Sequence, residues 1–226
     1  MDEITHHIEK HIVRALAYKP TARFSEMRPP RTDSNLYSYH LSKLLRQGFI
    51  AKYGRDYHLT PKGLQYVDRL SMRSMRPVLQ SKITTGILVK NEYDEVVLSS
   101  RGKQPFLDAW GLPLGKTHVD DRSISDSAQR ELHERTNVLT DQLIHVGDCY
   151  VKTSVDGYMV SNVFTHVFYK ELLKDSVRLS SFARWVSLDD LTSIEMVPGA
   201  RELIYLVLNS DGHFFEELTF DVKSGV

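Results

Sequence analysis

The sequence has a single cysteine and no long hydrophobic run, and both absences restrict its class. Cys149 has no second cysteine with which to form a disulfide, which excludes a disulfide-stapled secreted scaffold and favours a reducing compartment. No apolar run approaches the roughly 20 residues that a membrane-spanning helix needs. The first residues, MDEITHHIEKH, are polar and include early acids, unlike a secretory signal. We therefore expect a soluble, cytoplasmic protein with no membrane partner.

Glycine and proline are also sparse, with 12 and 8 among 226 residues, which excludes collagen-like and low-complexity chains. Hydrophobic residues make up 41% and charged residues 26% of the chain. This is the mixture of a globular protein, and the length predicts one or two domains.

The chain has no net charge, yet its charges are unevenly distributed. Residues 1–80 hold 14 Lys and Arg against 7 Asp and Glu, a net charge of +7, whereas residues 81–226 hold 15 against 22, a net charge of −7. A basic segment is typical of a protein that meets a polyanion, because cations near phosphates release condensed counterions. Attraction between two oppositely charged halves explains the same asymmetry, so composition leaves both interpretations open.

The N-terminal part predicts three helices followed by a hairpin. Apolar residues at i+4 spacing predict the first helix, while Thr32 and Asp33 are good N-caps for the third and Gly48 is a typical C-terminal cap. The expected order is a helix over 4–18, a short helix around Phe24–Met27, a helix from Thr32 or Asp33 to Gly48, strands at 49–53 and 57–60, and a helix from Pro61, followed by the basic stretch Met72–Pro77.

The segment TDSNLYSYHLSKLLRQGFIAKYGRDYHLTPKG resembles the winged helix-turn-helix modules of bacterial and archaeal transcription regulators. In that pattern YHLxxLxxxGxI marks the recognition helix and the start of the wing, and YxLTxxG marks the end of the wing. The resemblance covers about residues 4–71 and implies a DNA-binding domain over residues 1–76 with duplex DNA as its partner. Some winged helices bind protein instead.

A recognition helix lies in the major groove and presents its N-terminal side chains to base edges. Asn can bond adenine bidentately and Ser can serve either base, whereas basic side chains contact phosphates and fix the register. The candidates for these roles are Arg28, Arg31, Ser34, Asn35, Ser38, Lys43 and Arg55. The alternative is that the basic residues form a solvated face and the tyrosines pack in the core. For Tyr39 and His40, which lie beside core leucines, we expect packing.

Beyond residue 80 the predicted strands and helices are mixed without a regular βαβ repeat, which favours an α+β fold. Ser123, three residues before Asp126, is a capping-box-like helix start. The expected strands are at 83–89, 96–99, 143–152, 158–169 and 185–188, and the expected helices at 123–137 and 199–209. A strand-like FFEELTF run follows, within a C-terminal extension at 211–226, and the sequence assigns it no role.

The segment WGLPLGKTHVDDRSISDSAQRELHERTNV resembles the Nudix box, the phosphate- and metal-binding loop and helix of hydrolases that cleave nucleoside diphosphates linked to another group. The family's pattern is Gly, five residues, Glu, seven residues, then Arg-Glu-Leu-x-Glu-Glu-x-Gly and an aliphatic residue. Gly115 matches the glycine, and residues 130–134 match Arg-Glu-Leu-x-Glu. The resemblance covers about residues 80–208 and implies a Nudix-type mixed sheet between helices over residues 80–210.

The departures from this pattern concern the metal ligands. Arg135 stands where the family has its last Glu, and the loop holds one extra residue. The upstream acid therefore falls on Asp121 when counted from Gly115 and on Arg122 when counted from Arg130.

Residues at i, i+3 and i+4 share a helix face, and three carboxylates on such a face suit Mg²⁺. A guanidinium about 4 Å away instead opposes a cation by about 4 kcal/mol per unit charge at an effective dielectric of 20. We therefore expect no metal, no cofactor and impaired catalysis. If the box is active, Glu131, Glu134 and Asp121 are its catalytic candidates, and Glu131 and Glu134 are its Mg²⁺ ligands.

Together these patterns predict a homodimeric, DNA-binding transcriptional regulator whose Nudix-like domain senses a nucleotide or nucleotide-sugar. The candidate ligand-binding residues are Arg101, Lys116, Arg130, Arg135 and Trp110. One alternative is a divergent Nudix hydrolase that uses the winged helix for targeting or dimerisation, and another makes both domains platforms for protein partners.

Overall fold

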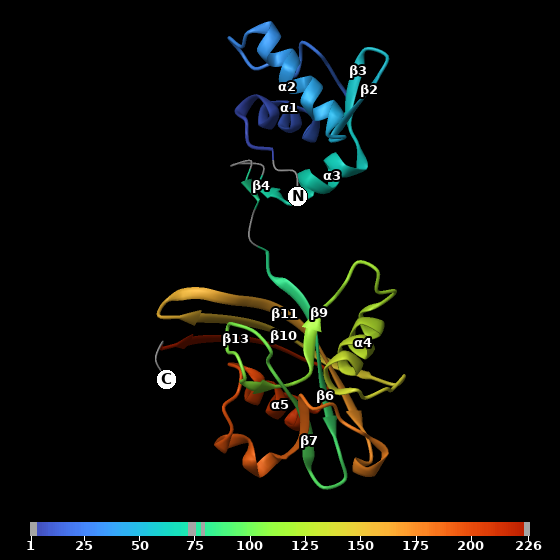
Figure 1. Cartoon of the computed structure of the whole chain (residues 1–226), viewed down its shortest axis with the longest axis vertical. Coiled ribbons are helices and arrows are strands. Elements are labelled where there is room, and N and C mark those ends of the chain that lie inside the picture. Colours follow the sequence, from blue (N-terminus) through green and yellow to red (C-terminus); the bar gives the residue numbers. More distant parts are fainter. Residues whose placement is uncertain (1–3, 72–75, 78–79, 224–226) are drawn as a thin grey trace. The chain divides into compact units, whose positions relative to one another are not determined.

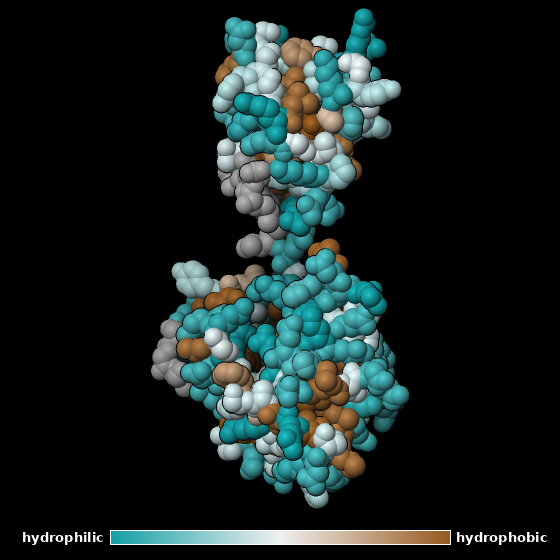
Figure 2. Space-filling model, turned by 45° about the vertical axis from the view of Figure 1, so that its right-hand side comes forward, coloured by the Kyte–Doolittle hydropathy of each residue, from teal (hydrophilic) through white to brown (hydrophobic). Residues whose placement is uncertain are grey.

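The chain folds into two units, and the second begins at Gln80. Figure 1 shows the first unit in blue to teal and the second in green to red. The computed structural model describes residues 4–71, 76–77 and 80–223, and its two units are Met1–Leu79 and Gln80–Val226. Mainly hydrophilic side chains cover the face seen in Figure 2, with smaller hydrophobic patches between them. Within the described ranges, no helix is long and apolar enough to cross a membrane. Most of the basic stretch expected at 72–77 lies outside the described residues.

The first unit has the element order of the winged helix-turn-helix that its sequence predicted, except that the short helix at 24–27 is absent. Its small sheet has the strand order β1-β3-β2, and both neighbouring pairs are antiparallel. The elements are α1 (His7–Ala17), β1 (Ala22–Arg23), α2 (Ser34–Arg46), β2 (Ile50–Tyr53), β3 (Asp56–Leu59), α3 (Pro61–Asp68), β4 (Leu70–Ser71) and β5 (Arg76–Pro77).

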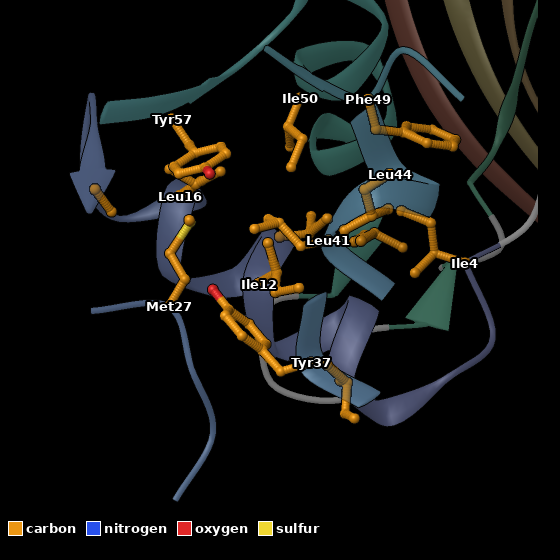
Figure 3. Close-up of a cluster of buried hydrophobic side chains, with 14 residues drawn as sticks. Ile4, Ile12, Leu16, Met27, Tyr37, Leu41, Leu44, Phe49, Ile50 and Tyr57 are labelled. Atoms are coloured by element: carbon orange, nitrogen blue, oxygen red, sulfur yellow. The ribbon is translucent and has the colours of Figure 1, made fainter. Parts of the chain in front are cut away.

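Side chains from α1, α2 and the wing form the core of this unit (Figure 3). Ile8, Ile12 and Leu16 follow the i+4 stripe of α1 and are fully or almost fully buried. The ends of α2 follow from its caps, because the Asp33 carboxylate accepts hydrogen bonds from the first-turn N–H groups and Gly48 adopts a φ of +72° just beyond the helix. Such a φ suits glycine, which has no Cβ.

Two expectations for this unit were wrong. Residues 24–27 form a turn rather than a short helix, because β1 ends at Arg23 and prolines begin at Pro29, which leaves too few residues for a helix. Tyr39 is 58% exposed rather than packed, since Tyr37 occupies the core stripe of α2 and is fully buried. His40, in contrast, is buried as expected.

The second unit is a mixed sheet with the strand order β12-β7-β6-β11-β10-β13, to which β8 adds beside β7 and β9 beside β6. Its elements are β6 (Lys82–Lys90), β7 (Glu95–Ser100), β8 (Trp110–Gly111), β9 (Leu114–Lys116), α4 (Ile124–Thr136), β10 (Ile144–Val155), β11 (Tyr158–Glu171), β12 (Ala183–Ser187), α5 (Ala200–Asn209) and β13 (Phe214–Val222), with short 3-10 helices at Lys174–Ser176 and Leu188–Ser193.

Helices cover both faces of this sheet. Ile87 on β6 packs in a cluster with Leu132 of α4, whereas the next residue, Leu88, packs with Leu203 of α5. Successive side chains of a strand point to opposite faces, so α4 and α5 lie on opposite sides of β6. This is the α+β fold, a mixed sheet between helices, that the sequence predicted.

The FFEELTF run, which the sequence left without a role, forms β13. It pairs in parallel with β10 over a register from Gly147↔Phe214 to Val155↔Val222, and the two strands lie side by side in Figure 1. Residues 214–222 therefore belong to the sheet of the second unit.

Candidate functional site

The Nudix-like segment places a strand backbone against a buried acid. A Cβ added to Gly115 on β9 would lie 1.7 Å from Oε2 and 2.3 Å from Oε1 of Glu131 on α4. Glu131 is only 4% exposed, so its carboxylate has little room to move aside. The residue at position 115 must lack a side chain for β9 and α4 to approach in this way.

Arg130 holds the loop before α4 to the helix. Its Nε donates to Oδ1 of Asp121 at 2.9 Å and its Nη2 to Oδ2 at 2.8 Å, while Nη2 also bonds the carbonyl of Lys116 at 3.1 Å. The Arg130 bonds and the backbone N–H of His118 hold the pKa of Asp121 well below its usual range. Arg122 is exposed, so Asp121 is the acid of this loop that meets the arginine of the helix.

The carboxylates of Glu131 and Asp121 pair with arginine side chains, and this arrangement does not fit a resident Mg²⁺. Oε1 of Glu131 accepts a 2.7 Å hydrogen bond from Nη1 of Arg130, and Oε2 lies 3.5 Å from Nε of Arg135. Asp121 is bonded to Arg130 through both of its oxygens. Glu134 is the most exposed of the three acids, and its Oε2 lies 3.7 Å from Arg130. Mg²⁺ requires oxygen ligands in near-octahedral geometry, and two of these three carboxylates already neutralise guanidinium groups.

A cavity of about 310 Å³ lies beside this segment. The end of β7, the strands β10 and β11, and the start of α5 contribute to its wall. The described residues that line it include the cations Arg101, Lys103 and Arg135 and no carboxylate. The cavity is therefore suited to an anion with an apolar part, since Leu112, Val163 and Leu203 also line it.

Two cations of the cavity wall, Arg101 and Arg135, repel each other. Burial lowers the pKa of Arg101, and the positive charge of Arg135 lowers it further. Arg101 donates to the carbonyl of Lys103 at 3.1 Å, and no carboxylate of the described chain pairs with it. An anion between the two guanidinium groups would relieve this repulsion.

The structure brings together only some of the residues proposed as ligand contacts. Arg101 and Arg135 line the cavity, whereas Lys116, Arg130 and Trp110 do not. Arg130 bonds the protein's own acids, Lys116 is exposed on β9, and the guanidinium of Arg184 lies 4.0 Å from the centroid of the Trp110 ring. Lys103 and the start of α5 also line the cavity but were not among the predicted ligand contacts. The only signal for either in the sequence is that Lys103 lies two residues after Arg101.

The residues proposed to contact DNA in the first unit differ in their exposure and in whether they bond other parts of the protein. Arg31, Ser34, Asn35 and Arg55 are exposed and Ser38 is half-buried, and Arg28, also exposed, donates to the carbonyl of Thr32.

Lys43 is held differently. Its Nζ donates at 2.8 Å to the fully buried carboxylate of Glu9 on α1, which also lies 2.7 Å from Nδ1 of His40. Lys43 therefore links α2 to α1.

The exposed face of α2 continues beyond Asn35. Tyr39, Ser42 and Arg46 are exposed and follow Asn35 at helical spacing. Ser42 was not among the DNA-contact candidates, and its periodicity with Asn35 is the signal that could have identified it.

A family model described as NUDIX domain matches residues 80–207. The sequence has no match among the curated proteins.

Three solved structures illustrate the structural likeness. The NUDIX domain of Shewanella oneidensis NrtR complexed with ADP ribose is 20% identical, with a TM-score of 0.48 over 65% of this chain and 95% of that one. A MutT protein from Bacillus halodurans is 20% identical, with a TM-score of 0.48 over 59% of this chain and 86% of that one. Shewanella oneidensis NrtR is 21% identical, with a TM-score of 0.47 over 56% of this chain and 61% of that one. At such identities the function has to be argued from this chain's own residues.

Proposed function

The chain belongs to the NUDIX domain family, and from that premise we propose that it is a DNA-binding transcriptional regulator whose NUDIX domain binds a nucleotide or nucleotide-sugar without efficient hydrolysis. The observation that carries this proposal is the cavity lined by Arg101, Lys103 and Arg135 and by no carboxylate among the described residues.

The cavity supports binding of a phosphorylated ligand. Guanidinium groups bind phosphate bidentately, and α5 begins at the cavity wall, where the positive end of a helix dipole favours an anion. The volume of about 310 Å³ is at the lower end of the range for small-molecule sites. The apolar part of the wall suits a base or sugar ring.

The acids support the second half of the proposal, which is the lack of efficient hydrolysis. In this family Mg²⁺ neutralises the diphosphate and helps to activate water, and Glu131 and Glu134 are the residues that would hold it. Glu131 is bonded to Arg130 and lies beside Arg135, so a bound ion would have to displace two guanidinium groups. We infer that the ligand is retained rather than cut.

The first unit supports DNA as the partner. The N-terminal turn of α2 exposes Ser34 and Asn35, and the wing exposes Arg55. This segment of the chain has a net charge of +7 over residues 1–80, as a domain that meets a phosphate backbone requires. We propose a homodimer that occupies two half-sites, in which the ligand favours one placement of the two winged helices over another.

The decisive experiment measures thermal stability of the full chain against ADP, ADP-ribose and UDP-glucose, with and without Mg²⁺. A ligand at about 100 times its Kd stabilises the fold by about 2.7 kcal/mol. We expect stabilisation by at least one of these compounds without Mg²⁺ and its loss in Arg101→Gln.

The same samples, assayed for product, test the hydrolase alternative. Mg²⁺-dependent turnover of any of these compounds that disappears in Glu134→Gln would establish an enzyme and overturn the proposal. Absence of stabilisation by every compound would overturn it as well.

A further inference from the structure

Two histidines and an aspartate meet on the sheet of the second unit, away from the site described above. His145 and Asp148 lie on β10 and His166 lies on β11, and their ligand atoms all lie within 4.8 Å of one another. Oδ1 of Asp148 is 3.0 Å from Nε2 of His145 and 2.7 Å from Nδ1 of His166. A third histidine, His213, has its Nε2 3.8 Å from Oδ2 of Asp148.

Strand pairing brings these residues together from distant parts of the chain. Asp148 is directly opposite His166 in the antiparallel pair of β10 and β11. On the other edge of β10, Gly147 pairs with Phe214 of β13, so His213 reaches the same place just before that strand begins. The three strands are neighbours in the sheet (Figure 1).

A β-bulge makes the cluster possible. His145 and Asp148 are three residues apart, and side chains at an odd separation on a regular strand point to opposite faces. The register shift between His145 and Gly147 brings both side chains to one face, as bulges do where a side chain has to be re-aimed.

Glycine is required within this bulge. A Cβ at Gly147 would lie 2.5 Å from the Phe214 ring. Phe214 therefore packs against this backbone only because the residue is glycine, and that packing fixes the start of β13 and the position of His213.

The cluster lies on the face of the sheet opposite the anion cavity. Val151 and Thr165 line the cavity, and Asp148 and His166 are separated from them by odd numbers of residues along β10 and β11 beyond the bulge. Cys149 is buried on the cavity side with Val151. The donors of the cluster are therefore imidazole nitrogens and a carboxylate, with no thiolate.

We propose that His145, Asp148 and His166 bind one divalent transition-metal ion of the zinc class, with His213 as an additional ligand. Imidazole nitrogen suits Zn²⁺, Cu²⁺ and Ni²⁺, whereas Mg²⁺ and Ca²⁺ prefer oxygen. Around a tetrahedral Zn²⁺ with bonds of 2.0–2.1 Å, ligand atoms lie about 3.3 Å apart. The distances of 2.7 and 3.0 Å within the cluster require only small side-chain movements to reach that spacing.

Access and geometry support an ion that enters from solvent. The side chains of His145 and His213 are 37% and 52% exposed, while those of Asp148 and His166 are 20% and 24% exposed. The inner pair is thus positioned by the sheet and the outer pair faces solvent. The bound ion would join β10, β11 and the start of β13, so it would stabilise the C-terminal strand.

The test is a titration of the tag-free, chelator-stripped full chain with Zn²⁺ and with Co²⁺, followed by calorimetry and by the visible absorption of Co²⁺. We expect one ion per chain, a rise in Tm with Zn²⁺ and none with Mg²⁺. His166→Gln and His145→Gln should each weaken binding by about 100-fold, and His213→Gln by about tenfold. Two ligand variants are used so that a folding defect in one, detected from its Tm in chelator, leaves the other informative.

Matched controls separate this site from the acids of α4. His133→Gln and Glu134→Gln change exposed side chains of α4 and should leave Zn²⁺ binding unchanged. The proposal is overturned if Zn²⁺ does not bind, since the cluster is then only a hydrogen-bonded His-Asp-His group. It is equally overturned if binding survives both His166→Gln and His145→Gln, or is lost in Glu134→Gln.

Discussion

The Nε atom of Arg135 lies 3.5 Å from Oε2 of Glu131, one turn earlier on α4. Arg135 also lines the anion cavity, where Arg101 is its neighbour. One side chain thus neutralises Glu131 and presents a cation to the cavity. In the function proposed above, weak Mg²⁺ binding and binding of an anion therefore share one physical cause, the guanidinium of Arg135.

Replacing the positive charge of Arg135 by a negative one should weaken nucleotide binding and create a response to Mg²⁺. In Arg135→Glu we expect nucleotide binding to weaken by at least tenfold, because a charge-assisted hydrogen bond contributes about 1.5–3 kcal/mol. We expect Mg²⁺ to have no effect on the wild type and to stabilise the variant, because Glu131 and the new carboxylate repel each other without it. Thermal unfolding with and without Mg²⁺ and calorimetric titration measure the two effects. Arg122→Glu makes the same charge change on an exposed residue outside the cavity, and an equal response in this control would contradict the prediction.

The contact between β9 and α4 makes a prediction about stability. Gly115→Ala should cost about 1–3 kcal/mol of unfolding free energy, because its Cβ would overlap the Glu131 carboxylate. Gly102→Ala is the matched control, since a Cβ there meets nothing within 4 Å. In Gly115→Ala combined with Glu131→Ala the cost should be smaller than the sum of the single changes. Urea unfolding of the wild type, the three single variants and the double variant measures these costs, and strict additivity would rule out the contact as the cause.

The Asp121–Arg130 pair predicts how stability depends on pH. Because Arg130 lowers the pKa of Asp121, the pair stabilises the fold fully above the unfolded pKa of about 3.9. That contribution is lost as the pH falls toward the folded pKa. Asp121→Asn should therefore be less stable than wild type at pH 7, with a gap that narrows below pH of about 4. Urea unfolding at several pH values tests this, with the exposed neighbour Asp120→Asn as control. A gap independent of pH would show that the ion pair is not its source.

The parts of the fold that the sequence predicted are those that depend on local signals. The i+4 stripe of α1, the Asp33 cap and Gly48 fix two helices from residues near in the chain. The Nudix-like pattern similarly located Glu131 and Arg130 on α4. The short helix expected at 24–27 failed because propensity was considered without the two-residue strand β1, which exists only through pairing with β3.

Long-range pairing limited what could be predicted of the sites. Spacing placed the upstream acid at 121 or 122 depending on the direction of counting, and Asp121 was the candidate. The three-dimensional path of the loop is what joins Asp121 to Arg130. The cluster of His145, Asp148 and His166 depends on a strand register and a bulge, which leave no signature in the spacing of these residues. A proposed ligand contact such as Arg130 was also misplaced relative to the cavity, because sequence does not reveal that its own acids already satisfy it.

Substitution of two basic residues of the first unit should have different effects, one on stability and the other on DNA binding. Lys43→Met should lower the unfolding free energy by about 1–3 kcal/mol, because burial raises the pKa of Glu9 and the hydrogen bonds from Lys43 and His40 are what hold that pKa below its ordinary value. Arg55→Ala, at an exposed wing position, should leave stability unchanged. It should weaken duplex DNA binding by a similar factor for every DNA sequence. The slope of log Kd against log salt concentration should fall by about 1. Urea unfolding and binding titrations at several salt concentrations measure both variants. DNA binding that is unaffected by Arg55→Ala and insensitive to salt would remove the wing from the interface and favour a protein partner for this unit.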